Sequence, residues 1–443
     1  MQDVELERPA RRYSKWQQKM NSTYTTSSNF PIYGAVDRFR QITVRSARLQ
    51  LMIFGFCAAL LIGAVPNVLA EDTDNDEAYV TALIMDLSAP KFVVRQRAMS
   101  RLVAIGADAI PGLNAAIRNG NRETRFRAGR VLDAVEQNVF QQRLEQFIKA
   151  GVGDKNVNLP SWKMFCTKIP ETAESRRVFA QISRAEPRLC RSIEQGAAFA
   201  AKEIDRRCAE LQVAQRENRM STIAAGTITG LLFAAGMDDV KMNRYSVKTI
   251  FGLCNQPTFS GQLRVRSNTG NYTYPSNANA NIMRELFAGC LMHCESWDAQ
   301  MAFSLAMSLN IPQCLPRALE LVRDKQTPCQ VVQSVMIAIS MFGDKDDIPV
   351  LELRIADKSF CGVTQRINNV QYQTQLRDVT IAAMLILAKE DPKLYGFPRI
   401  QVLTSGQFSY SRVGFADEES RDKTRAKWDT FRATLKVPSL DGK

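Results

Sequence analysis

Apolar residues recur three and four positions apart along most of the chain from Asp76 onward, in runs of ten to fifteen residues. Short breaks rich in Pro, Gly and Asn separate these runs. A spacing of three and four residues places side chains on one face of an α-helix, and no alternating strand pattern of useful length competes with it. The sequence therefore predicts a series of short amphipathic helices.

The clearest helix pair is expected between Arg95 and Leu113. The segment reads Arg95-x-x-Ala98-x-x-x-Leu102-x-x-x-Gly106 and continues as Ala109-x-Pro111-x-Leu113. Ala98 and Leu102 share one stripe, and Gly106 ends this helix. Pro111 begins a second helix that turns back onto the first. Glu123 to Val139 repeats the first-helix pattern, which predicts a further unit.

A second set of helix pairs is expected near the C-terminus. Asn310 and Gly343 are 33 residues apart, and so are Pro316 and Pro349. Each proline lies early in an apolar helix, and an apolar stripe marks the helix between them. An internal period in the thirties with paired helices is typical of an α-solenoid.

The middle of the chain has two parts. Residues 151–254 are expected to be mostly helical, whereas residues 255–281 are dense in Asn, Ser, Thr, Gly and Pro. We interpret residues 255–281 as a loop or small hairpin insertion. Leu263-x-Val265 and Tyr272-x-Tyr274 are its candidate strands, around a turn at Asn268-Thr269-Gly270.

Residues Leu51 to Val65 form an uncharged apolar run of fifteen residues, between a basic flank and the acidic Glu71-Asp72. The run is followed by a Val-x-Ala ending at Ala70, so the segment is typical of a secretory signal cleaved after Ala70. Fifteen residues is short compared with the roughly 20 that span a bilayer, and retention as an N-terminal membrane anchor is the alternative. The polar leader before the run is unusually long, and a later start at Met20 would shorten it.

Charge disfavours nucleic acid as a partner. The net charge is +13, and the first seventy residues hold nine Lys or Arg against four Asp or Glu, so +5 lies there and +8 remains beyond. The rest of the chain is only mildly basic, and no block of five basic residues concentrates the charge.

His293 is the only histidine in the chain. A Ser-His-Asp or Cys-His arrangement would have to use this residue, which disfavours most nucleophile and metal chemistry. It lies in Cys290-Leu291-Met292-His293-Cys294, where the two cysteines share a helix face. A zinc site would need a fourth ligand such as Cys254 or Cys314, and neither has supporting spacing. We interpret the cluster as buried helix cysteines, with metal or redox chemistry as the alternative.

The other polar clusters have structural explanations. Nine cysteines follow the apolar run. In an exported chain some of them are expected to be oxidised, although several lie in apolar helical runs where a small buried thiol is expected.

The carboxylate pairs Asp238-Asp239 and Asp346-Asp347 are expected in turns between helices, where Asp caps backbone N–H groups. Six arginines recur on the first paired helices, and we expect them to bond within the stack, with an anionic partner as the alternative. They are Arg95, Arg97, Arg101, Arg125, Arg127 and Arg130.

Several of these motifs resemble those of HEAT-repeat proteins. The run from Ser340 to Leu351 resembles the turn between helices of that family, including its phycobilisome-lyase-type HEAT-like repeats. Leu159-Pro160-Ser161-Trp162, Arg184 to Leu189, and Asp391 to Phe397 resemble motifs of uncharacterised exported HEAT-repeat proteins of planctomycete bacteria. The resemblance implies an all-α fold, namely an irregular α-solenoid of HEAT-like helical hairpins with a loop or small hairpin insertion in the middle. It implies no lyase activity, because the repeats serve there as a scaffold and no catalytic residue matches.

These features predict seven segments. They are a polar basic leader at 1–50, a signal region at 51–70, HEAT-like repeats at 71–150, a helical middle at 151–254, the insertion at 255–281, further HEAT-like repeats at 282–400, and a tail with a terminal helix at 401–443.

We expect an exported scaffold that binds a protein partner and is not an enzyme. No catalytic, cofactor-binding or metal-binding residue is predicted, and a membrane would be a partner only if residues 51–65 stay as an anchor. The alternative is an envelope enzyme or a metal or redox protein that uses carboxylates or the cluster of Cys290, His293 and Cys294.

Overall fold

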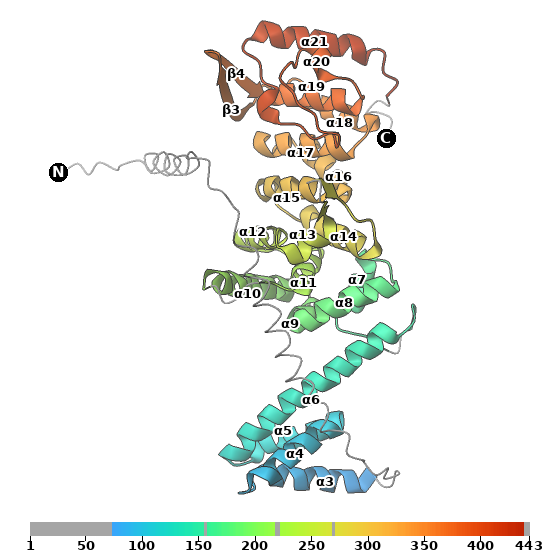
Figure 1. The fold of residues 1–443 in the computed structure, drawn as a ribbon, viewed down its shortest axis with the longest axis vertical. Coiled ribbons are helices and arrows are strands. Elements are labelled where there is room, and N and C mark those ends of the chain that lie inside the picture. The colour runs from blue at the N-terminus through green and yellow to red at the C-terminus, as the bar shows by residue number, and fades with distance from the viewer. Residues whose placement is uncertain (1–72, 155–156, 218–221, 268–270, 438–443) are drawn as a thin grey trace, which may run out of the picture. The chain divides into compact units, whose positions relative to one another are not determined.

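The computed structural model describes residues 73–154, 157–217, 222–267 and 271–437 (Figure 1). They are mostly helical, which confirms the helical class expected from the sequence. The chain divides into two compact units, residues 1–77 and residues 78–443; the described helices lie in the second, except that the first of them begins at Thr73. The leader, the apolar run and the junction at Ala70 lie outside the described residues. In the part of the chain that is described, no helix is long and apolar enough to cross a membrane.

The first helices form a small core of their own. They are α3 (Thr73–Asp86), α4 (Phe92–Ile105), the 3₁₀ turn η1 (Gly106–Ala109), α5 (Ile110–Asn119) and α6 (Arg122–Lys149). α4 ends at Gly106, whose φ of 76° suits glycine, and α5 begins with Pro111 in its first turn, so the predicted helix stop and start are confirmed. α5 packs on α6 rather than back onto α4. Ala98, Leu102 and Leu113 are buried in this core.

The long helix α6 contributes to two hydrophobic cores. Ala128, Val131 and Val135 belong to the core of the first helices, whereas Leu144 and Phe147 belong to the core of the remaining chain. Its N-terminus is capped by Asn121, whose side chain accepts a hydrogen bond from the backbone N–H of Thr124.

The next five helices lie in the predicted helical middle, and the last of them is buried. They are α7 (Trp162–Lys168), α8 (Ala173–Ala185), α9 (Pro187–Gln195), α10 (Ala197–Arg216) and α11 (Ala225–Ala235). From Gly226 onward every residue of α11 is buried. A Cβ atom at Gly226 would lie 2.4 Å from the carbonyl oxygen of Gln181, so glycine is what lets α11 approach the backbone of α8. Phe147, Trp162, Phe165, Phe179 and Phe233 form a connected group of ring contacts around this crossing.

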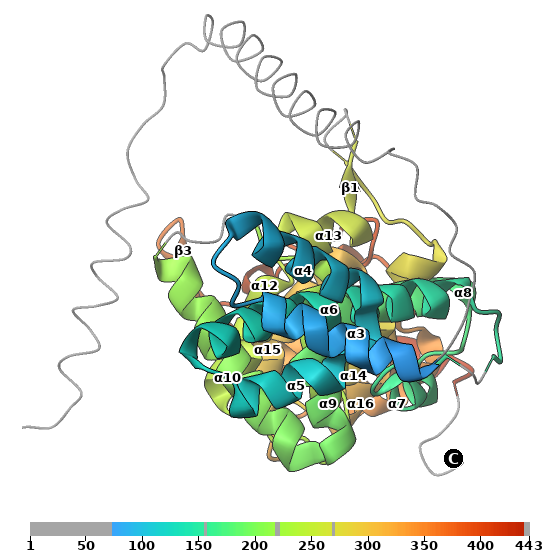
Figure 2. The same ribbon diagram turned by 90° about the horizontal axis from the view of Figure 1, so that it is seen from below.

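The next part contains the segment predicted as an insertion. α12 (Arg244–Leu253) precedes α13 (Pro257–Leu263), and a short antiparallel pair follows, β1 (Val265–Arg266) with β2 (Tyr272–Thr273). β1 projects beyond α12 and α13 (Figure 2). The two strands overlap the segments predicted as candidate strands. The preceding part of the insertion, Pro257 to Leu263, is helical instead of a loop, because Pro257 begins a helical turn and Phe259 and Leu263 are buried in the core.

The C-terminal part repeats a helix, a 3₁₀ turn and a proline-initiated helix. Its elements are α14 (Ala278–Met292), α15 (Ser296–Leu309), η2 (Pro312–Cys314), α16 (Leu315–Arg323), α17 (Cys329–Phe342), η3 (Lys345–Asp347), α18 (Ile348–Glu352), α19 (Leu376–Leu387), α20 (Pro392–Tyr395), η4 (Tyr410–Arg412) and α21 (Glu418–Arg432). Pro316 and Pro349 occupy the first turns of α16 and α18, as the period of 33 residues predicts.

The helices of residues 197–387 pack in two rows. α10 packs on α12, α12 on α15, α15 on α17, and α17 on α19, while α11 packs on α14 and α16 on α18 (Figure 1). Helices of one row alternate along the sequence with helices of the other from α14 to α19.

A β-hairpin contradicts the expectation that no strand pattern of useful length exists. β3 (Phe360–Ile367) pairs antiparallel with β4 (Val370–Gln375). The turn residues Asn368 and Asn369 have φ of 49° and 62°, the left-handed conformation that tight hairpin turns need and that Asn tolerates. The backbone of Phe415 pairs with Gln373, which adds a further bridge to β4.

Candidate functional site

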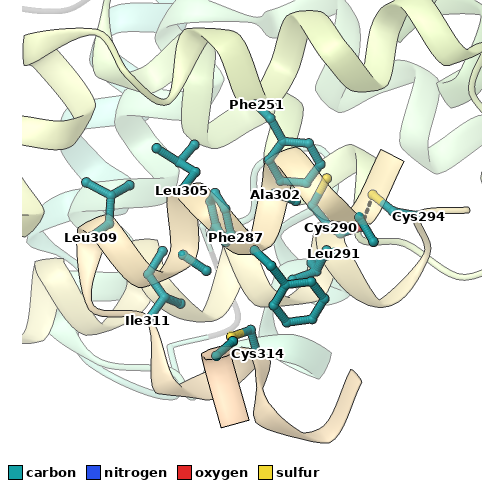
Figure 3. Packing of buried hydrophobic residues seen from close by; sticks show 14 of the residues in the cluster. Phe251, Phe287, Cys290, Leu291, Cys294, Ala302, Leu305, Leu309, Ile311 and Cys314 are labelled. Carbon is teal, nitrogen blue, oxygen red and sulfur yellow. Dashed lines mark hydrogen bonds between the residues drawn. The ribbon is translucent and has the colours of Figure 1, made fainter. Parts of the chain in front are cut away.

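The sequence singled out Cys290, His293 and Cys294, and the structure separates the histidine from the two neighbouring thiols. Cys290 lies in the last turn of α14 and is fully buried, and Cys294 follows the helix and is 2% exposed. The Cys294 thiol donates a hydrogen bond to the carbonyl oxygen of Cys290 at 3.3 Å. Both cysteines pack among Phe251, Leu291 and other core side chains (Figure 3). The thiols are therefore core groups, as interpreted from the sequence.

His293 faces a different environment. Its Nε2 lies 3.5 Å from Oδ1 of Asp238, which also pairs with Nζ of Lys168 at 3.0 Å. His293 lines a cavity of about 350 Å³ together with Lys168 and Glu285, and neither Cys290 nor Cys294 lines it. A site that combined the histidine with the two thiols is not assembled.

The remaining cysteines are also unpaired thiols. None of the nine cysteines in the described residues forms a disulfide. Seven are buried and two, Cys166 and Cys329, are half-buried. Burial raises the pKa of Cys190 to about 12, and burial likewise raises the pKa of Cys254. Thiolate chemistry is therefore disfavoured at these positions, and in the described ranges no group of three or more His, Cys, Asp or Glu side chains could hold a metal ion.

The two carboxylate pairs lie in turns between helices. Asp347 accepts a hydrogen bond from the backbone N–H of Asp344 at 3.1 Å, and Asp344 caps the same turn. Asp238 follows α11, where the hydrogen bond from Lys168 lowers its pKa. Asp346 and Asp347 thus belong to a capping arrangement, whereas Asp238 makes ion pairs with Lys168 at the end of α7 and with His293 at the end of α14.

Three of the six arginines singled out on the first helices bond within the fold. Arg95 donates to the carbonyl oxygens of Ala89 and Pro90 at 2.8 and 2.7 Å, and Arg127 pairs with Glu123. Arg101 donates to the hydroxyl of Tyr79 at 2.9 Å. Arg97, Arg125 and Arg130 are exposed.

Further along the chain, arginines connect successive helices in a way that the sequence did not reveal. Arg317 on α16 donates to the carbonyl oxygen of Cys294 at the end of α14 at 2.9 Å. Buried Arg354 donates to the carbonyl oxygens of Val322 and Asp324 at the end of α16 at 2.9 and 2.5 Å. The last carbonyls of a helix lack partners within it and carry partial negative charge, so a guanidinium there stabilises the junction.

An exposed apolar surface lies on α12 and α15. Tyr245 is 77% exposed, Trp297 is 64% exposed and Met301 is 41% exposed. We call these three residues the Tyr245–Trp297 surface. Large aromatic side chains in water are unusual on a folded body that has a core available for them.

An ion pair joins the first turns of α12 and α15. Nε of Arg244 in α12 donates to Oδ1 of Asp298 in α15 at 3.1 Å, and the Asp298 side chain is almost fully buried. Tyr245 directly follows Arg244, and Trp297 directly precedes Asp298, so both aromatic residues lie in first turns that the ion pair joins. The Tyr245–Trp297 surface is our candidate functional site. No sequence pattern marks this surface, because an aromatic residue at helical spacing is usually part of a core.

No protein-family model matches this sequence, and no curated protein matches it at a significant level.

Proposed function

We propose that the helical body is a HEAT-like α-solenoid that serves as a scaffold and binds a protein partner through the Tyr245–Trp297 surface. The observation that carries the proposal is the exposure of two aromatic residues in first turns that are joined by the ion pair of Arg244 with the buried Asp298. Tyr and Trp are the residue types that most often dominate the free energy of protein association.

The packing of the helices supports the solenoid part of the proposal. α12 and α15 pack on each other, and the Arg244–Asp298 ion pair joins their N-terminal turns, so the two helices run in the same direction. Equivalent helices of successive repeats are parallel in a solenoid, and each repeat contacts its neighbours. The arginine bonds from Arg317 and Arg354 to the ends of α14 and α16 join successive members of the other row.

The partner expected for this surface is a protein with an apolar pocket that accepts an aromatic side chain. The test is affinity capture from envelope extracts with the wild-type chain and with the Tyr245→Ala/Trp297→Ala variant. A control variant, Met85→Ala/Leu403→Ala, removes two other exposed apolar side chains. Loss of each aromatic anchor is expected to weaken binding by about 2 kcal/mol, so the double variant should lose the partner and the control should keep it.

Two results would contradict the proposal. One is the reproducible absence of a partner for the wild-type chain, and the other is capture of the same partner by the Tyr245→Ala/Trp297→Ala variant. The metal or redox alternative is tested separately with Cys290→Ala, His293→Ala and Cys294→Ala, since a scaffold keeps its partner in these variants.

We also propose that the chain is exported and cleaved after Ala70. The support is the fifteen-residue apolar run with its basic flank and Val-x-Ala ending. Mass spectrometry of the native protein should then find an N-terminus at Glu71. An intact leader on the native protein would contradict cleavage and favour the membrane-anchor alternative.

A further inference from the structure

A basic pocket lies in the C-terminal part, on elements that the Tyr245–Trp297 surface does not use. It has a volume of about 750 Å³. Its lining comes from the end of β3, from α20, from the loop after α20 and from η4. The lining residues are Gln365, Arg366, Ile367, Lys393, Pro398, Arg399, Ile400, Gln401 and Arg412. Four of them are cations and none is an acid, so the pocket carries a formal charge of +4 from these residues.

Arg399 is held in place by neutral groups. Its guanidinium carbon lies 3.7 Å from the centre of the Tyr372 ring. Its Nη1 donates to Oε1 of Gln365 at 3.3 Å, and its Nη2 donates to the carbonyl oxygen of Gly414 at 2.5 Å. These contacts fix the orientation of the guanidinium group but leave its positive charge without a carboxylate partner.

The other three cations are free to meet a ligand. The side chains of Arg366, Lys393 and Arg412 are exposed, and within the described ranges they have no hydrogen-bond or ion-pair partner. Arginines elsewhere in this part of the chain do have acidic partners. Arg425 pairs with Asp429 at 2.8 Å, and Arg432 pairs with Glu352 at 2.6 Å. The basic pocket therefore concentrates positive charge that the fold itself does not neutralise.

The electrostatics of the pocket favour an anion. Burial lowers the pKa of Arg399; Tyr372 opposes this change, and the positive charge of Arg412, the smallest of the three effects, acts in the same direction as burial. A bound anion would relieve the repulsion between these like charges.

We propose that the basic pocket binds a small phosphate-bearing molecule with at least two negative charges. Guanidinium groups bind phosphate oxygens through paired N–H donors, and four cations suit a ligand of high charge density. A volume of about 750 Å³ is within the range of small-molecule pockets and exceeds what one inorganic phosphate fills. Ile367, Pro398 and Ile400 offer apolar contact to the rest of such a ligand.

The test is isothermal titration calorimetry of the full chain with pyrophosphate, with citrate as a polycarboxylate probe of similar charge. The pocket variant is Arg366→Gln/Arg412→Gln. The matched control, Arg184→Gln/Lys248→Gln, removes the same net charge from two exposed residues on α8 and α12. Each lost cation should weaken pyrophosphate binding about tenfold, so the pocket variant should bind about a hundredfold more weakly while the control stays within about threefold of the wild type.

Lys393→Gln gives a second test on another element, with a loss of about tenfold expected. All the substituted side chains are exposed, so thermal unfolding should show that each variant remains folded. The proposal is overturned if pyrophosphate at millimolar concentration does not bind the wild type, or if both double variants lose affinity equally. Citrate binding as tight as pyrophosphate binding would overturn the assignment to phosphate.

Discussion

A buried ion pair joins the last helix to the rest of the C-terminal part, and its removal gives the sharpest prediction about stability. Nε of Arg421 in α21 donates to Oδ1 of the fully buried Asp378 in α19 at 2.7 Å. Oδ2 of Asp378 accepts the backbone N–H of Gln375 at 2.9 Å. Arg421 also pairs with Glu418 and donates to the carbonyl oxygen of Gln373 at 3.1 Å.

Arg421→Met is expected to destabilise the protein strongly at neutral pH. The change leaves a buried carboxylate with one backbone donor, and breaking a buried pair from one side costs about 3 to 5 kcal/mol. In the double variant Asp378→Asn/Arg421→Met no buried charge is left unpaired, so the loss should be smaller than the sum of the two single losses by roughly 1 to 3 kcal/mol.

The same pair predicts a dependence of stability on pH. Burial raises the pKa of Asp378 to about 6 from the ordinary 3.8, although hydrogen bonds from Arg421 and from the Gln375 backbone oppose the rise. The folded chain therefore holds a proton on Asp378 at pH values where the unfolded chain has lost it. The contribution of Asp378 to the free energy of unfolding is largest below its ordinary pKa of 3.8. It is lost as the pH rises toward and through about 6.

The magnitude follows from the two pKa values. A difference of about 2 units corresponds to about 3 kcal/mol in total, of which about 2 kcal/mol falls between pH 4.5 and pH 7. Urea unfolding followed by circular dichroism should show the advantage of the wild type over Asp378→Asn shrinking by that amount across this range. Other titrating groups are common to both proteins, so they cancel in the difference. A difference that stays constant or grows as the pH rises would refute this account of Asp378.

Two further predictions concern packing and thiol access. Gly226→Ala should lower the free energy of unfolding by about 1 to 3 kcal/mol, because its Cβ would meet the Gln181 carbonyl at 2.4 Å. The control Gly252→Ala, where no atom lies within 4 Å of the new Cβ, should raise the free energy of unfolding by up to about 1 kcal/mol in the same urea titration. Equal effects of the two changes would contradict the close approach of α11 to the backbone of α8. Iodoacetamide labelling at pH 8 with mass spectrometry should modify half-buried Cys329 before buried Cys190, whose pKa burial raises to about 12. Faster labelling of Cys190 would show that the core around it opens.

Helix positions were the most predictable feature. Pro111, Pro316 and Pro349 each begin the second helix of a pair, and all three follow a 3₁₀ turn. This placement is local, because proline lacks an N–H that the first turn does not need. The β3–β4 hairpin also had a local signal, since Asn368-Asn369 separates two segments of alternating residues. The expectation that no strand pattern of useful length exists was therefore wrong.

The candidate sites were not predictable in the same way. The basic pocket collects Arg366, Lys393, Arg399 and Arg412 from a strand, a helix, a loop and a turn, and no spacing along the chain marks them as neighbours. The Tyr245–Trp297 surface depends on which face of α12 and α15 remains uncovered, and this is decided by the helices packed on the other faces.

The sequence by itself determined where helices begin and end, because helical periodicity, glycine stops and proline starts act over a few residues. Which helices pack on each other was decided by the tertiary structure, since α5 packs on α6 and α16 packs on α17. The single histidine and the lack of a further cysteine at the spacing of a zinc site also predicted that Cys290 and Cys294 are buried core residues. Only the tertiary structure decided which charges find partners. Arg421 meets Asp378 across 43 residues of sequence, while the cations of the basic pocket meet no acid among the residues that line it, and this balance depends on contacts between distant segments.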